Sequence, residues 1–149
     1  MAEKFIENIA EWEMVLEIEA KSENEAFART VTALYAARLN PTLEEIDDIK
    51  TAVSEAVTNS IIHGYKFKSG KVRVKCTVHN KNEFYVAIED DGCGIEDIDT
   101  AMQPLYTTSP ELERSGMGFS FMEAFMDNVF VESKPDVGTK VIMRKIVKM

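Results

Sequence analysis

The stretch TLEEIDDIKTAVSEAVTNSIIHG, residues 42–64, predicts one long helix. Thr42 and Glu45 have the spacing of a capping box, in which each side chain binds the other residue's backbone N–H. Apolar residues then recur at helical spacing until Gly64, a residue type that commonly ends helices. Glu55 and Asn59 are four residues apart, so they share one face of this helix. A carboxylate and an amide together make a poor core pair, so this face is either solvated or a ligand site.

The segments on either side of this helix predict an α+β fold. Trp12 to Ala20 alternates apolar and mostly acidic residues, as a half-buried strand does, and Ser22 with Glu25 indicates a second capping box that opens a helix. The same periodicities predict strands at 72–78, 84–88, 128–133 and 139–147, and a helix at 118–126. This order is typical of a two-layer α/β sandwich, with helices on one face of a mixed, mostly antiparallel sheet.

Length and charge narrow the function classes. The chain has 149 residues, of which 45% are hydrophobic, and a formal net charge of −9. This predicts a single domain over 1–149, with residues 1–10 as an N-terminal extension. The sequence shows neither a membrane-spanning run nor a signal peptide, so we expect a cytoplasmic protein with no membrane partner. The acid excess argues against nucleic acid, whose phosphates require clustered Lys and Arg.

The two cysteines predict neither a disulfide scaffold nor a metal site, because they lack CxxC spacing. Cys76 alternates with Val72, Val74 and Val78, which is typical of a small buried residue in a strand. Cys93 lies between two glycines, where a loop position is the simpler interpretation than a nucleophile.

Two glycine motifs follow the long helix. In Asp90-Asp91-Gly92-Cys93-Gly94, after a predicted strand, the glycines allow a tight turn or a close approach to a ligand. The aspartate can accept a hydrogen bond from a planar amine such as adenine N6, although a plain turn is an equal alternative. Gly116-Met117-Gly118 either presents backbone N–H groups to an anion at a helix start or is only a loop end. The poorly periodic residues 95–117 between these motifs predict a long loop of the kind that often closes over a site.

The order of these motifs resembles a known fold. A helix with Glu-x-x-x-Asn, then Asp-x-Gly-x-Gly, a long loop, Gly-x-Gly before a helix and finally Gly138-Thr139 is similar to the nucleotide-binding fold shared by histidine kinases, gyrase B, Hsp90 and MutL. The stretches SEAVTNSIIHGY at 54–65 and QPLYTTSPELERSGMGF at 103–119 resemble the sporulation anti-sigma F factor family of serine protein kinases. The resemblance covers roughly residues 12–147.

The resemblance implies a role for each matched position. Asn59 would be the magnesium ligand, and Glu55 would be the general base that accepts the proton of a serine hydroxyl. Asp90 would hold the adenine amino group, supported by the Thr139 hydroxyl. Arg114 would reach the γ-phosphate as a second catalytic residue. The other nucleotide-binding positions would be Gly92, Gly94, Ile95, Thr107, Thr108, Gly116, Met117, Gly118 and Phe119, with 95–117 as an ATP lid.

Some assignments stay open. Thr107 and Thr108 either touch phosphate or cap local turns. His63 either approaches the phosphates or, as we favour, interacts with the dipole at the end of its helix. Arg29 either meets a partner or pairs with Glu25 one turn earlier in its own helix, which is the simpler interpretation.

The resemblance also implies a function. The protein would bind and inhibit a sporulation sigma factor of the sigma F type and would use Mg²⁺ and ATP, released as ADP, to phosphorylate a serine of an anti-anti-sigma partner, acting as a homodimer. One alternative is a sigma-binding module for which the nucleotide is only structural, and another is a related stress-response anti-sigma kinase. Glu55 beside Asn59 favours an enzyme, because nucleotide binding alone requires no base. The run with Thr107, Thr108 and Arg114 favours the sporulation branch.

Overall fold

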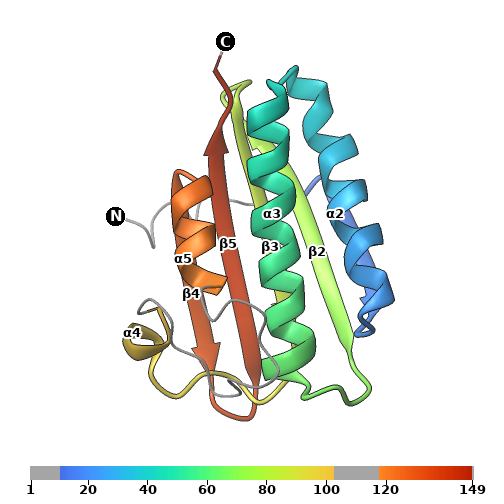
Figure 1. Cartoon of the computed structure of the whole chain (residues 1–149), viewed down its shortest axis with the longest axis vertical. Helices are drawn as coiled ribbons and strands as arrows, with labels where there is room; N and C mark the ends of the chain where they lie inside the picture. Colours follow the sequence, from blue (N-terminus) through green and yellow to red (C-terminus); the bar gives the residue numbers. More distant parts are fainter. Residues whose placement is uncertain (1–10, 103–117, 149) are drawn as a thin grey trace.

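The computed structural model describes residues 11–102 and 118–148. The strands are β1 (Met14–Glu19), β2 (Lys71–His79), β3 (Glu83–Asp90), β4 (Asn128–Lys134) and β5 (Gly138–Ile146). The helices are α2 (Glu23–Ala36), α3 (Leu43–Asn59), α4 (Ile98–Ala101) and α5 (Gly118–Phe125), with a 3₁₀ turn η1 (Ala37–Leu39) and a π-helical turn η2 (Ser60–Gly64). The strands form one sheet in the order β1-β2-β3-β5-β4, and α2, α3 and α5 lie on one of its faces (Figure 1).

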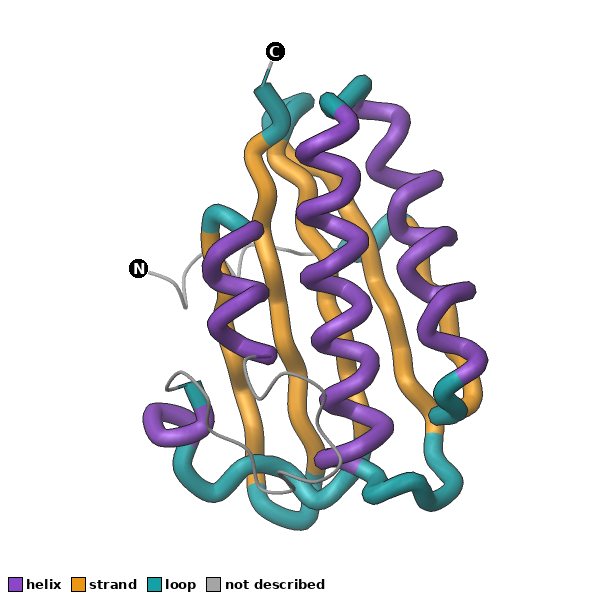
Figure 2. Tube along the Cα trace, in the orientation of Figure 1, coloured by secondary structure: helices purple, strands orange, loops and turns teal. Residues whose placement is uncertain are grey.

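The expected two-layer α+β architecture is confirmed, and Figure 2 shows the helical layer in front of the strands. In the described residues all four strand pairings are antiparallel, so the sheet is purely antiparallel instead of mixed. Two of these pairings, β2–β3 and β4–β5, are antiparallel because each joins strands that follow one another in the chain through a short turn. No helix of the described ranges is long and apolar enough to cross a membrane.

The core lies between the sheet and the three helices. Val72, Val74 and Cys76 point from β2 into this layer and are fully buried, which confirms the interpretation of Cys76. Burial raises the pKa of the Cys76 thiol to about 12. From α3, side chains four residues apart, Ile49, Val53 and Val57, meet them. Each fully buried aliphatic side chain contributes about 1.5–3 kcal/mol, so α3 is fixed firmly along the middle of the sheet.

One of the two expected capping boxes forms. At the start of α3 the Glu45 N–H donates to Thr42 Oγ1 at 3.1 Å and the Thr42 N–H donates to Glu45 Oε1 at 2.9 Å. The box expected at Ser22 is wrong, although the helix after it is present. Ser22 already has helical dihedral angles, whereas a capping residue needs an extended backbone. Glu25 accepts a hydrogen bond from the Ser54 hydroxyl instead.

Two local features differ from the expected pattern. The regular α-helix ends at Asn59, and residues 60–64 form the π-helical turn, in which the Tyr65 N–H donates to Ser60 O at 2.9 Å. The stretch expected as a loop from residue 95 contains α4, capped by Asp97, whose Oδ1 accepts from the Thr100 N–H at 3.1 Å. This short helix lies apart from the other three, to the left of the lower part of β4 in Figure 1.

Candidate functional site

The candidate site lies where the end of α3, the loop after β3 and the start of β5 meet. Asp90 ends β3 and pairs with Thr139 of β5 in the strand register. Its side chain is buried, with 6% exposure. The Gly92 N–H donates to Asp90 Oδ1 at 2.9 Å, and the Ser60 side chain and the Thr139 backbone N–H also hydrogen-bond to the carboxylate. These groups hold an acceptor at the edge of the core.

The pKa of Asp90 is set by two opposing influences, its burial and the hydrogen-bond donors around its carboxylate. Burial raises the pKa of the Asp90 carboxyl above its ordinary value, and the neighbouring charge of Asp91 acts in the same direction. The hydrogen bonds from Gly92, Ser60 and Thr139 lower this pKa and so oppose the effect of burial. A buried carboxylate with acceptor capacity left is suited to an amine donor of a bound molecule.

Close backbone packing explains two glycines around Asp90. A Cβ on Gly92 would lie 2.3 Å from the Gly64 carbonyl oxygen, and a Cβ on Gly64 would lie 3.0 Å from Asp90 Oδ1. The Cys93 N–H donates to Gly64 O at 2.9 Å. The loop after β3 therefore packs directly on the π-helical turn. Sequence reasoning identified Gly92 as a site residue but gave Gly64 only the role of ending a helix, because its contact with residues 90–93 is not local.

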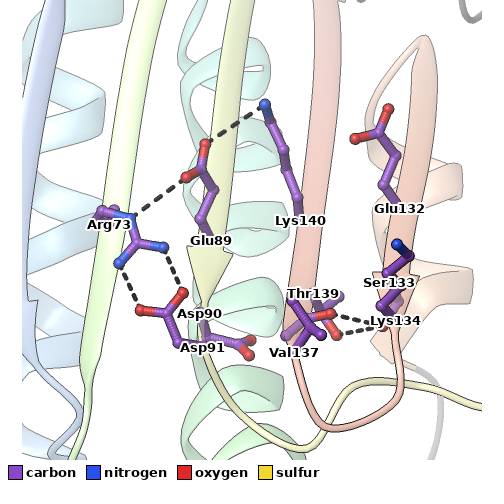
Figure 3. Close-up of a pocket in the computed structure, with 11 residues that line it drawn as sticks. Arg73, Glu89, Asp90, Asp91, Glu132, Ser133, Lys134, Val137, Thr139 and Lys140 are labelled. Carbon is purple, nitrogen blue, oxygen red and sulfur yellow. Dashed lines mark hydrogen bonds and ion pairs between the residues drawn. The ribbon is translucent and has the colours of Figure 1, made fainter.

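Thr139 is beside Asp90 but contacts it differently from expectation. Its hydroxyl oxygen lies 2.8 Å from Ser133 Oγ (Figure 3). Its backbone N–H bonds to the Asp90 carboxylate. Ser133 Oγ also accepts from the Ile95 N–H at 2.7 Å and lies 3.0 Å from Gly138 O. Ser133 was missed from sequence, since nothing in a serine of an alternating strand indicates these partners.

The loop after β3 is also fixed from the outer face of the sheet. Arg73 forms two hydrogen bonds of 2.9 Å to the Asp91 carboxylate and approaches Glu89 (Figure 3). This pairing lowers the pKa of Asp91 and raises that of Arg73. The Asp91 N–H donates to the Tyr65 hydroxyl oxygen at 2.7 Å. These contacts position Asp91, the residue next to Asp90, and Arg73 was not among the site residues expected from the sequence.

The structure has a turn at Gly94 and a helix that begins at Gly118, as the sequence predicts. Gly94 has a φ of +74°, and a Cβ there would lie 2.0 Å from Lys134 O, so only glycine fits. Gly118 begins α5, and Phe119 is half-buried against the core. The other expected site residues lie outside the part of the chain that the structure describes: Thr107, Thr108, Arg114, Gly116 and Met117.

Glu55 and Asn59 are half-buried side chains of the last turns of α3. Glu55 lines a shallow pocket together with Arg29, Asp47, Lys50, Thr51 and Ser54. Arg29 Nε lies 3.2 Å from Glu25 Oε2, so the intrahelical pair expected from the sequence is confirmed. The last turns of α3 thus present a carboxylate and an amide just before the turn that packs on the Asp90 loop, and the pocket beside Glu55 also holds Lys50 of α3 and Arg29 of α2.

No group of three or more His, Cys, Asp or Glu side chains in residues 11–102 and 118–148 is arranged to hold a metal ion. The donor set on α3 is the amide oxygen of Asn59, with the Glu55 carboxylate one turn away. A single hard oxygen ligand fits Mg²⁺, which commonly takes its other ligands from substrate phosphates and water. The residues present therefore fit an ion that arrives with a nucleotide.

Comparison with known proteins defines the class. Residues 18–145 match the family described as histidine kinase-like ATPase domain. Among solved structures, the blue-light activated histidine kinase EL346 of Erythrobacter litoralis aligns with a TM-score of 0.57 at 20% identity, covering 79% of this chain and 40% of that one. Its histidine kinase domain aligns with a TM-score of 0.53, covering 81% and 63%. The fold is therefore that of this ATPase class.

Proteins with similar sequences identify a family within the histidine kinase-like ATPase domains. The anti-sigma F factor of Clostridium acetobutylicum is 59% identical over 132 residues, which is 89% of this chain and 92% of the relative. Those of Clostridium kluyveri and Clostridium novyi are 56% and 54% identical, over 93% and 94% of their lengths. The chain belongs to the anti-sigma F factor family of histidine kinase-like ATPase domains.

Proposed function

We propose that this protein is an ATP-dependent protein serine kinase and an anti-sigma factor. It would bind and inhibit a sporulation sigma factor of the sigma F type and phosphorylate a serine of an anti-anti-sigma protein, acting as a homodimer in the cytoplasm. The observation that carries the proposal is one continuous element: α3 presents Glu55 and Asn59, and its π-helical turn packs on the loop of Asp90. The names of the relatives support the sigma factor as a partner.

The adenine nucleotide is assigned to Asp90 and its surroundings. The buried carboxylate supplies an acceptor for an exocyclic amine, and backbone without side chains at Gly64 and Gly92 lies directly against it. The two glycines let the π-helical turn and the loop after β3 pack on each other, which holds the carboxylate beside this turn. Among the described residues, the phosphate-binding candidate is Gly118 at the N-terminal end of α5, where backbone N–H groups and the helix dipole favour an anion.

Asn59 would hold Mg²⁺, which when bound neutralises phosphate charge and orients the transferred group. Glu55 lies one helical turn before Asn59. In the proposed reaction the Glu55 carboxylate accepts the proton of the partner's serine hydroxyl. The serine oxygen forms a bond to the γ-phosphorus of ATP while the bond from that phosphorus to the β–γ bridging oxygen breaks, which releases ADP. Proton transfer of this kind contributes about 10²–10⁴-fold to a rate.

The test is a transfer assay with the intact chain. The protein is incubated with ATP labelled at the γ-phosphate, Mg²⁺ and an anti-anti-sigma protein, and label on a serine of that protein is measured. Sigma factor capture is measured in parallel with and without nucleotide. Asn59→Ala is the matched variant, and it should lose Mg²⁺-dependent nucleotide binding while its circular dichroism spectrum is unchanged.

The outcomes separate the functions. Labelled partner together with nucleotide-dependent sigma capture supports the kinase. Nucleotide-dependent sigma capture without labelling indicates a binding module for which the nucleotide is structural. If the Asn59→Ala variant labels the anti-anti-sigma protein at the wild-type rate, Asn59 is not part of the site.

A further inference from the structure

Asp91 is the first residue beyond β3, and side chains from two other segments hold it. Its N–H donates to the Tyr65 hydroxyl oxygen at 2.7 Å. Its carboxylate accepts two hydrogen bonds of 2.9 Å from the Arg73 guanidinium (Figure 3). The backbone and the side chain of Asp91 are therefore restrained separately, at the point where the chain leaves the sheet.

Contacts with neighbouring segments fix Tyr65 in turn. Its N–H closes the π-helical turn by donating to Ser60 O at 2.9 Å. Its hydroxyl, while accepting from Asp91, donates to Lys71 O at 2.6 Å at the start of β2. The half-buried ring lies over Gly70, where an added Cβ would be 2.4 Å from Tyr65 Cε1. Burial raises the pKa of the Tyr65 hydroxyl above its ordinary value, so the hydroxyl keeps the proton that it donates.

The three backbone N–H groups that follow β3 each have a different acceptor. The first donates to the Tyr65 hydroxyl, and the third, on Cys93, donates to Gly64 O at 2.9 Å. The middle one, on Gly92, donates to Asp90 Oδ1 at 2.9 Å. Because only two rotatable backbone bonds separate one N–H from the next, fixing the outer two restricts the direction of the middle one. The end of the π-helical turn thus holds the loop on both sides of the N–H that binds Asp90.

We propose that Tyr65 is a positioning residue for base recognition: its hydroxyl fixes the first N–H after β3 and so keeps the Gly92 N–H on Asp90 Oδ1, which orients the carboxylate toward the 6-amino group of an adenine nucleotide. This inference rests on the proposed nucleotide site. Rotation about the last bond of an aspartate side chain is soft, so a fixed donor is needed to select one orientation. A tyrosine that served only the packing of the core would act through its ring, which phenylalanine reproduces.

The first measurement is amide hydrogen exchange of the intact chain without nucleotide. Tyr65→Phe keeps the ring over Gly70 and removes only the hydroxyl. The N–H groups of Asp91 and Gly92 should then exchange about three- to tenfold faster than in the wild type, the effect of one net hydrogen bond. An unchanged exchange rate at Gly92 would overturn the proposal, because the hydroxyl would then have no influence on the donor to Asp90.

The second measurement compares dissociation constants for ATP and for the purine ribonucleoside triphosphate that lacks the 6-amino group. In the wild type, ATP should bind more tightly. Tyr65→Phe should weaken ATP by about three- to tenfold and should change binding of the analogue by less than about twofold. An equal loss for both ligands would overturn the proposal, because the hydroxyl would then support the site in general. Unchanged ATP affinity would overturn it as well.

Tyr35→Phe is the matched control. It also removes one tyrosine hydroxyl, from α2, where the ring centroid lies 6.1 Å from that of Phe84, at the opposite end of β3 from Asp90. It should leave the exchange rates after β3 and both dissociation constants unchanged. Failure of the wild type to bind either triphosphate would overturn the proposed nucleotide site itself, and this result is distinct from a loss of base preference in Tyr65→Phe.

Discussion

Asp90 keeps its acceptor function in a place that favours the neutral acid. Burial is the largest influence on its pKa and raises it, and three hydrogen-bond donors act in the other direction. The position therefore depends on its donors as much as on the carboxylate itself. The strand end itself supplies one of these donors, the Gly92 N–H, because the N–H groups of residues just beyond a strand are not used by the sheet.

Asp90→Asn should reduce adenine recognition. The amide presents an N–H donor in place of one acceptor oxygen, so the exocyclic amine of adenine meets a donor. A hydrogen bond to a charged group contributes about 1.5–3 kcal/mol, so ATP affinity should fall roughly 10- to 100-fold. Competition between ATP and GTP measures the effect. An ATP-to-GTP ratio equal to that of the wild type would show that Asp90 does not select the base.

Glu55→Gln should separate binding from chemistry. Glutamine keeps the size of the side chain but cannot accept a proton at neutral pH, so serine phosphorylation should fall by about 10²–10⁴-fold. Nucleotide affinity and sigma factor capture should persist, because neither requires proton abstraction. Single-turnover transfer to the anti-anti-sigma protein is the measurement. A rate within about twofold of the wild type, with binding intact, would exclude Glu55 as the base and direct attention to His63.

At the scale of elements, regular periodicity was enough to predict each strand and the helices of the described core. It predicted the capping box at Thr42 because both partners lie in one local pattern. It failed at Ser22, where the pattern is the same but the backbone is already helical. The π-helical turn and the contacts of Ser133 with Ile95 and Thr139 depend on packing between distant segments, and no local pattern contains that information.

The two capping motifs allow a direct stability comparison. Thr42→Ala should lower the free energy of unfolding by about 1 kcal/mol, because it removes the acceptor of the Glu45 N–H. Ser22→Ala should have a much smaller effect, because the Ser22 side chain makes no capping bond. Urea denaturation of both variants checks this. Equal losses would mean that the hydrogen bonds at Thr42 do not stabilise α3.

For the molecule as a whole, the outer face of the sheet carries paired carboxylates. Arg144 lowers the pKa of Glu83 through a half-buried ion pair across neighbouring strands, and Asn80 adds a second hydrogen bond. A carboxylate with a lowered pKa in the folded state stabilises the protein above its unfolded pKa. That contribution is lost as the pH falls through the lower, folded value.

Glu83→Gln should therefore reduce stability most at neutral pH. The difference from the wild type should shrink as the pH falls below the ordinary value of 4.5, because the unfolded chain then binds a proton at Glu83 while the folded carboxyl is still ionised. The difference should be smallest once the folded carboxyl is also protonated at its lower pKa. Urea denaturation at pH 7 and at several values below 4.5 gives the comparison. A difference in the free energy of unfolding that does not change with pH would show that the charge of Glu83 does not contribute to stability.

The strand order has a consequence for synthesis on the ribosome. β3 lies between β2 and β5, yet β5 follows β3 in the chain only after α4, α5 and β4. Proteins are made from the N-terminus, so a nascent chain holds β3 with one edge unpaired until β5 has emerged. Thr139, the register partner of Asp90, arrives with that last strand. The corner around Asp90, which we propose for base recognition, is thus among the last parts of the fold to be completed, and a chain that still lacks β5 lacks Thr139 at this corner.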